Sequence, residues 1–120
     1  MRIVMKFGGV LMEDPEQIAN SASLVAERAK KDDEVVVTVS AMSNVTDEII
    51  AMGESARIGD MERVRPALER LEKRHLDAAE KLCDEKVLGE TTVTIKRLIE
   101  TLSQCLTGVF LLRELTPRSR

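Results

Sequence analysis

The sequence predicts an α/β protein in which a strand–helix–strand unit forms a short parallel sheet and a long helical hairpin follows. Two apolar runs, "RIVM" at 2–5 and "VVVTV" at 35–39, flank a single amphipathic segment. Beyond residue 45 the apolar residues recur at helical spacing instead. Two strands joined by one helix make a βαβ unit, so we expect a right-handed crossover between them.

The first helix is predicted from its start signal and its apolar stripe. Asp14 is a favourable N-cap, Pro15 suits the first helical position, and Gln17 can complete a capping box. We therefore expect a helix from Pro15 to about Lys31, on one face of the sheet. Its apolar stripe consists of Ile18, Ala22, Val25 and Ala29.

The strands on either side of this helix are expected at 2–6 and 34–40. The second strand is a continuous β-branched run without alternation, which is typical of a strand covered on both faces in a parallel sheet. We expect the strands to pair in parallel and the later helices to cover the face opposite the first helix.

The second half of the chain is predicted to be helical near 45–58, 60–84 and 91–113. Asn44 is a candidate cap for the first of these helices, and a break is expected near Gly89. The two longer helices carry apolar residues alternately three and four positions apart, which predicts an antiparallel hairpin with matched seams. The seam residues are Val64, Leu68, Leu71, His75, Ala78 and Leu82 in one helix, and Ile95, Leu98, Leu102, Cys105, Val109 and Leu112 in the other.

Composition narrows the classes of function. The 120 residues suffice for one domain or part of one, and 18 Lys and Arg against 21 Asp and Glu give a net charge of −3. With only 2% aromatic residues, this balance argues against nucleic-acid binding. No apolar stretch approaches membrane-spanning length, and Lys6 interrupts any signal-peptide core. We expect a cytoplasmic protein, with no membrane partner, whose cysteines Cys83 and Cys105 are reduced and buried.

A candidate phosphate site lies at the end of the first strand, where Lys6, Phe7, Gly8 and Gly9 follow one another. Neither G-x-x-x-x-G-K-[ST] nor G-x-G-x-x-G is present. Ligands of open α/β sheets gather at the carboxyl ends of the strands. Glycines there let backbone N–H groups approach a phosphate, and Lys6 would supply a point charge. A tight turn without a ligand is the alternative interpretation.

Hydroxyl side chains follow the second strand in "VSAMSNVTDE". Ser40 and Thr46 flank the start of the next helix, where hydroxyls and backbone amides form a natural anion site. If the strands are neighbours, both residues face the same crevice as Lys6. The alternative is that Ser43, Asn44 and Thr46 only cap the helix.

Three segments together carry a resemblance to a known family. "KFGG" at 6–9, "VVVTVSAMSNVTDEII" at 35–50 and "LTPRSR" at 115–120 resemble the start of an aspartate kinase, of the amino acid kinase family. The resemblance spans the whole chain and implies a partial, amino acid kinase-like three-layer fold. Residues 1–120 would be the N-terminal part of the catalytic domain, with 1–45 as the βαβ unit with the phosphate loop and 46–115 as the helical region.

The resemblance implies an enzyme that transfers the γ-phosphoryl group of ATP, bound with Mg²⁺, to the side-chain carboxylate of L-aspartate. This reaction would serve the biosynthesis of lysine, threonine and methionine. A homo-oligomer is expected, and no metal site in this chain. Lys6 would be catalytic; Lys6, Phe7, Gly8, Gly9 and Ser40 would bind the phosphates of ATP, and Ser40 and Thr46 would bind aspartate.

The chain departs from the family pattern directly after the glycine pair. Family members usually have two hydroxyl residues there, whereas this sequence has Val10 and Leu11. In such kinases the nucleotide-binding half and the ACT regulatory domains follow "LTPRSR", and both are absent from these 120 residues. We therefore expect the isolated chain to be inactive.

Other interpretations stay open. The chain is alternatively a non-catalytic kinase-like module that associates with a partner chain through its hairpin, another member of the amino acid kinase family, or a small anion-binding α/β protein unrelated to kinases. His75 is expected to pack in the hairpin rather than to catalyse. The charged run at 69–81 is interpreted as a solvated helix face with Glu69–Lys73 and Asp77–Lys81 pairs.

Overall fold

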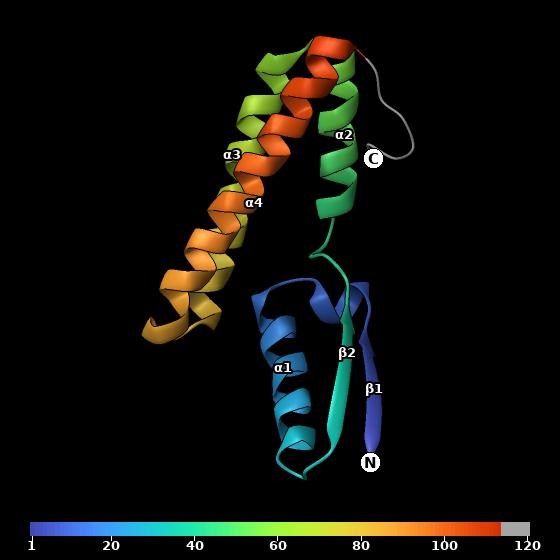
Figure 1. The fold of residues 1–120 in the computed structure, drawn as a ribbon, viewed down its shortest axis with the longest axis vertical. Helices are drawn as coiled ribbons and strands as arrows, with labels where there is room; N and C mark the ends of the chain where they lie inside the picture. Colours follow the sequence, from blue (N-terminus) through green and yellow to red (C-terminus); the bar gives the residue numbers. More distant parts are fainter. Residues whose placement is uncertain (114–120) are drawn as a thin grey trace. The chain divides into compact units, whose positions relative to one another are not determined.

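The computed structural model of the protein describes residues 1–113 (Figure 1). Their backbone divides into two compact units, Met1–Val45 and one that begins at Thr46. The elements in chain order are β1 (Arg2–Phe7), the 3-10 turn η1 (Gly9–Met12), α1 (Pro15–Ala29), β2 (Glu34–Val39), α2 (Val45–Arg57), α3 (Met61–Leu82) and α4 (Glu85–Leu112).

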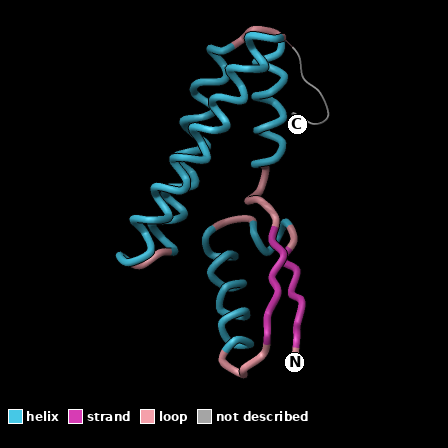
Figure 2. Tube along the Cα trace, in the orientation of Figure 1, coloured by secondary structure: helices cyan, strands magenta, loops and turns pink. Residues whose placement is uncertain are grey.

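The first unit is the predicted βαβ unit. β1 and β2 pair in parallel, in register from Arg2 opposite Glu34 to Phe7 opposite Val39 (Figure 2). Side chains alternate between the two faces of a strand. Phe7, which is 4% exposed, and Val39 line the face on which α1 packs. The expected parallel pairing and the helix on one face are both confirmed.

The start of α1 follows the predicted capping signal. Asp14 has extended backbone geometry, and its carboxylate accepts a hydrogen bond of 2.9 Å from the Gln17 N–H. Pro15 is the first helical residue, where its missing N–H costs nothing. The helix ends at Ala29, earlier than the predicted Lys31, and the chain then turns through Asp32 in the left-handed region (φ 61°).

The prediction that the second strand is covered on both faces is wrong for the described residues. Val36, Val37 and Val39 remain 50%, 40% and 58% exposed. A two-stranded sheet with one helix cannot bury both faces of β2, and α1 itself leaves a groove of about 350 Å³ beside Val37 and Val39. The groove is lined almost wholly by apolar side chains.

The second unit is helical, as predicted, but one of its connections is placed differently. α3 begins after Asp60, whose carboxylate accepts from the Arg63 N–H at 3.3 Å. The chain reverses at 83–84 rather than near Gly89, which lies inside α4. α4 starts early because Asp84 caps it. The Asp84 carboxylate accepts hydrogen bonds from two backbone N–H groups of the first turn.

The hairpin seam is confirmed in α3 except at its last residue, Leu82, which is exposed, and it is wrong in part of α4. Val64, Leu71 and Ala78 are 0%, 2% and 6% exposed. The residues predicted for the α4 seam lie on two adjacent sides of the helix. A single neighbouring helix covers only one of these sides. On α4, Leu106 is buried and Ile95, Leu102 and Val109 are half-buried, whereas Leu98, Cys105 and Leu112 are exposed.

The predictions for His75, the charged face of α3 and the two cysteines are confirmed only in part. His75 packs half-buried with Nδ1 2.8 Å from the Leu71 carbonyl; because a carbonyl only accepts, Nδ1 carries the proton. On the charged face Lys73 pairs with Asp77 at 2.8 Å, and neither the expected Glu69–Lys73 nor the expected Asp77–Lys81 pair forms within residues 1–113. Both cysteines are free; Cys83 is only half-buried and Cys105 is exposed, so the predicted burial holds in part for Cys83 and is wrong for Cys105. Among the described residues, no helix is both long and apolar enough to cross a bilayer.

Candidate phosphate-binding site

Lys6 is the next-to-last residue of β1 and stands directly opposite Thr38 in the parallel ladder. Phe7 turns into the α1 side of the sheet, so strand alternation places Lys6 on the opposite face. Lys6 is exposed there. The strand therefore delivers a cation to the carboxyl edge of the sheet, where ligands of α/β folds bind.

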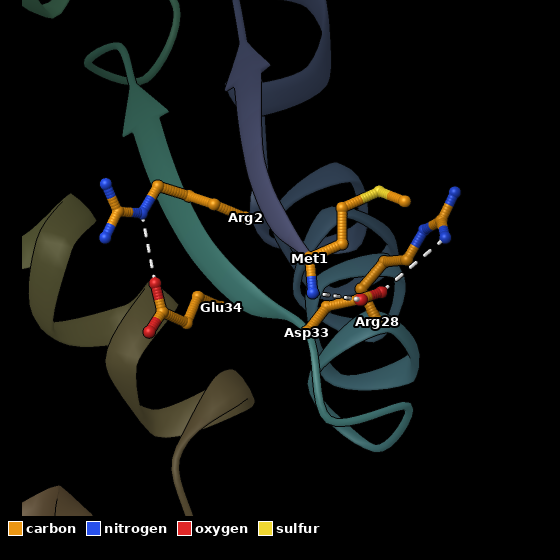
Figure 3. Close-up of polar contacts among 5 residues, drawn as sticks. All are labelled: Met1, Arg2, Arg28, Asp33 and Glu34. Carbon is orange, nitrogen blue, oxygen red and sulfur yellow. Dashed lines mark hydrogen bonds and ion pairs between the residues drawn. The ribbon is translucent and has the colours of Figure 1, made fainter.

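At the other end of the sheet, charged residues at the starts of the two strands form ion pairs (Figure 3). Arg2 Nε lies 3.0 Å from Glu34 Oε2, and Asp33 is within 3.7 Å of the Met1 amino group and 3.8 Å of Arg28 Nη1. Lys6, in contrast, forms no ion pair within residues 1–113. The carboxyl edge of the sheet thus presents an uncompensated positive charge.

The glycine pair lies in open space beside this cation. Gly8 has an extended backbone (φ −83°, ψ −170°) that any residue adopts, and Gly9 begins η1. Within the described chain, a β-carbon added at either position would meet no atom beyond its chain neighbours within 4 Å. Neither the backbone conformation nor internal packing requires glycine at these positions. A ligand that approaches the main chain closely would require it.

The loop that carries the glycines is held at several points. The Leu11 N–H donates to the Gly8 carbonyl at 3.0 Å, so the N–H groups of Gly9 and Val10 precede the first hydrogen bond of the turn. The buried hydroxyl of Ser21, on α1, donates to the Leu11 carbonyl at 3.0 Å. These contacts fix the loop against α1.

The hydroxyl residues after β2 are only partly brought together with Lys6. Ser40 follows Val39, the partner of Phe7, so it stands at the same edge of the sheet as Gly8; its hydroxyl donates to the Ala41 carbonyl at 3.1 Å. Thr46 belongs to the second unit, as the second residue of α2. Its role with aspartate stays a prediction.

Asn44 does not cap α2 as expected. Its φ of 67° lies in the left-handed region, whereas an N-cap residue is extended, and no hydrogen bond from its side chain to the helix is present in residues 1–113. The turn is instead closed by the Val45 N–H, which donates to the Met42 carbonyl at 3.2 Å. Asparagine tolerates this conformation, so here it makes the turn between β2 and α2.

Thr38 is a further candidate site residue, which the sequence pattern alone did not indicate. It is level with Lys6 in the ladder and shares its face of the sheet, and it is exposed. Thr38 is the single hydroxyl residue within "VVVTV". Counting both strands from their first residues in a parallel register would have placed it opposite Lys6.

The chemistry of this edge fits an anion rather than a metal. Lys6, the amides of Gly9 and Val10, and the hydroxyls of Thr38 and Ser40 are groups that can donate hydrogen bonds to phosphate oxygens. No group of three or more His, Cys, Asp or Glu residues that could hold a metal ion is found in the described part of the chain.

Comparison with known proteins shows the family of this chain. The amino acid kinase family profile matches residues 1–109, and the chain belongs to the amino acid kinase family. It is 32% identical over 120 residues to "Aspartokinase 2, chloroplastic" and 33% identical over 119 residues to "Aspartokinase 3, chloroplastic", both of Arabidopsis thaliana. Each match covers 98% of this chain and 20% of the relative.

A bacterial relative matches more closely over a shorter range. "Aspartokinase" of Helicobacter pylori strain J99 is 46% identical over 55 residues, or 46% of this chain and 14% of the relative. The chain thus spans about a fifth of the length of the Arabidopsis relatives. Family membership excludes the interpretation as an anion-binding protein unrelated to kinases. "LTPRSR", which contributed to the resemblance, lies outside the described residues.

Proposed function

We propose that this chain is the N-terminal segment of the catalytic domain of an aspartate kinase. The complete enzyme would transfer the γ-phosphoryl group of ATP to the side-chain carboxylate of L-aspartate, in the biosynthesis of lysine, threonine and methionine. Membership of the amino acid kinase family and the aspartokinase relatives support this proposal. Residues 1–45 would form the phosphate-binding βαβ unit and 46–115 the helical region.

The reaction needs positioned charge more than acid–base chemistry. A carboxylate oxygen of aspartate would attack the γ-phosphorus while the bond to the bridging oxygen of ADP breaks, giving an acyl phosphate without a proton transfer. Lys6 would hold the negative charge that spreads over the phosphoryl oxygens, as cations do in other phosphoryl transfers. Mg²⁺, bound to ATP, would neutralise further phosphate charge.

The remaining roles follow from position at the same edge of the sheet. The backbone from Phe7 to Gly9 would bind the phosphates, Ser40 would lie between phosphate and substrate, and Thr46 would bind aspartate. The observation that carries the proposal is the unpaired Lys6 beside two glycines that the fold itself does not require. A ligand contact at that loop accounts for both features.

A chimera tests the function of the segment. Residues 1–120 would replace the matching fifth of Arabidopsis "Aspartokinase 2, chloroplastic", and enzyme-dependent acyl phosphate would be trapped with hydroxylamine. We expect aspartate- and ATP-dependent hydroxamate from the chimera and none from the isolated 120-residue chain, because positioning of both reactants requires the complete site. A folded chimera that lacks activity would favour the non-catalytic module.

The acceptor is tested in the same assay. L-Glutamate and N-acetyl-L-glutamate would replace aspartate, and preference for either would assign the segment to another member of the family. Homo-oligomeric assembly and a cytoplasmic location are separate proposals, tested by sedimentation and by imaging of the tagged chain. Two of the relatives are named as chloroplastic.

A further inference from the structure

A cavity of about 430 Å³ opens between α2 and α3, within the second unit. This volume is within the roughly 300–1,000 Å³ typical of small-molecule sites. Small side chains account for the space, because Ala51 on α2 and Ala67 on α3 both line it. The other lining residues are Glu48, Met52, Ser55, Arg63 and Arg70.

The charged side chains that line this cavity do not form ion pairs with one another in the described part of the chain. Arg63 is engaged with Asp60 through an N–O distance of 3.4 Å. Glu48 and Arg70 form no ion pair with each other or with any other group in residues 1–113. The cavity therefore presents one anion and one cation, each still able to take a partner.

These charges disfavour two simple kinds of ligand. A plain anion such as phosphate would be repelled by Glu48, and a plain cation would be repelled by Arg70 and Arg63. A molecule with one carboxylate and one ammonium group satisfies both. The planar guanidinium of Arg70 suits bidentate contact with a carboxylate, and the carboxylate of Glu48 suits an ammonium.

We propose that the α2–α3 cavity binds a small zwitterion with an apolar side chain, the class to which free α-amino acids belong. The carboxylate of the ligand pairs with Arg70 and its ammonium group with Glu48. The Ser55 hydroxyl adds a hydrogen bond, and the apolar part of the ligand lies on Met52 and the two alanines. This inference does not depend on the phosphoryl-transfer function.

Chemical-shift titration of the ¹⁵N-labelled 120-residue chain with L-norvaline tests the proposal. We expect saturable shifts concentrated on the amides of α2 and the first half of α3. Arg70→Gln and Glu48→Gln should each weaken binding about three- to fivefold, the range set by one solvent-accessible ion pair. Arg65→Gln and Glu62→Gln, exposed on α3 but outside the cavity, should leave the affinity unchanged.

Two analogues separate the zwitterion from its parts. Pentanoate lacks the ammonium group of norvaline and butylamine lacks its carboxylate, so both should bind at least about threefold more weakly. Equal affinity for pentanoate, or indifference to Glu48→Gln in a chain whose spectrum shows an intact fold, would overturn the zwitterion. Absence of any saturable shift with norvaline would overturn the site itself.

Discussion

Two glycines in the helical unit should respond to alanine with opposite signs. Gly59, between α2 and α3, has φ +89°, and a β-carbon there would lie 2.6 Å from Arg113 Cζ and 2.9 Å from Arg113 Nη2. Gly89 lies inside α4, and a β-carbon there would meet nothing within 4 Å in the described chain.

The magnitudes follow from these two environments. A left-handed backbone costs an ordinary residue about 1–2 kcal/mol. Displacing Arg113, whose guanidinium lies 4.4 Å from the Phe110 ring centroid, adds up to about 1 kcal/mol. Gly59→Ala should therefore lower the free energy of unfolding by about 1–3 kcal/mol. Gly89→Ala should raise it by about 0.5–1 kcal/mol, the helix-propensity difference.

Urea unfolding followed by circular dichroism measures both changes. In an Arg113→Ala background, only the backbone part of the Gly59→Ala cost, about 1–2 kcal/mol, should remain. If Gly59→Ala stabilises the chain as Gly89→Ala does, the left-handed turn at 59 and the contact with Arg113 are both refuted.

Three further substitutions test other parts of the structure. Val64→Ala removes fully buried methyl groups and should lower the free energy of unfolding in urea by about 1.5–3 kcal/mol. Val93→Ala, at a position 65% exposed, should lower it by under about 0.5 kcal/mol. Equal losses of stability would contradict the assigned seam. Asn44→Val should cost about 1–2 kcal/mol while Asn44→Gly is nearly neutral, because of the left-handed φ; two equal values would contradict that turn. The hydrogen bond from Lys73 to Asp77, and then the charge of Asp77, raise the pKa of Lys73 above its ordinary 10.5. The contribution of this pair to stability is therefore present below pH 10.5 and is lost as the pH rises through the raised pKa. Asp77→Asn should lower the pKa of Lys73 in a ¹³C NMR titration, and an unchanged pKa would exclude the pair.

Local signals in the sequence predicted most of the first unit. Asp14 and Pro15 fixed the start of α1 because capping depends on neighbouring residues alone. The parallel pairing was predicted from the strand–helix–strand order of a βαβ unit, and it is confirmed. The burial of β2 was not predictable in the same way. A continuous β-branched run indicates that a strand suits burial on both faces, but it does not show whether other elements cover those faces in the described residues.

The errors in the predicted α4 seam have a common cause in the helical period. Apolar residues three and four apart on α4 occupy two adjacent sides, and only packing decides which side faces α3. Leu98 is 60% exposed for that reason. At the candidate site, Lys6 and the glycines were proposed from their order in the sequence alone, whereas proposing Thr38 required the strand register. The left-handed Asn44 was missed because the same residue type favours both caps and turns.

The most direct test of the account is the steady-state kinetics of Lys6→Ala in the aspartokinase chimera. Because Lys6 is proposed to hold charge that develops during transfer, kcat should fall on the order of 100-fold or more, with a smaller change in KM. Lys6→Arg should recover only part of this loss, since the planar guanidinium cannot occupy the same point beside Gly8. Lys31→Ala, an exposed lysine after α1, should leave kcat unchanged. If Lys6→Ala retains a kcat close to that of the parent chimera, the end of β1 is a strand followed by a turn and the phosphate site is wrong.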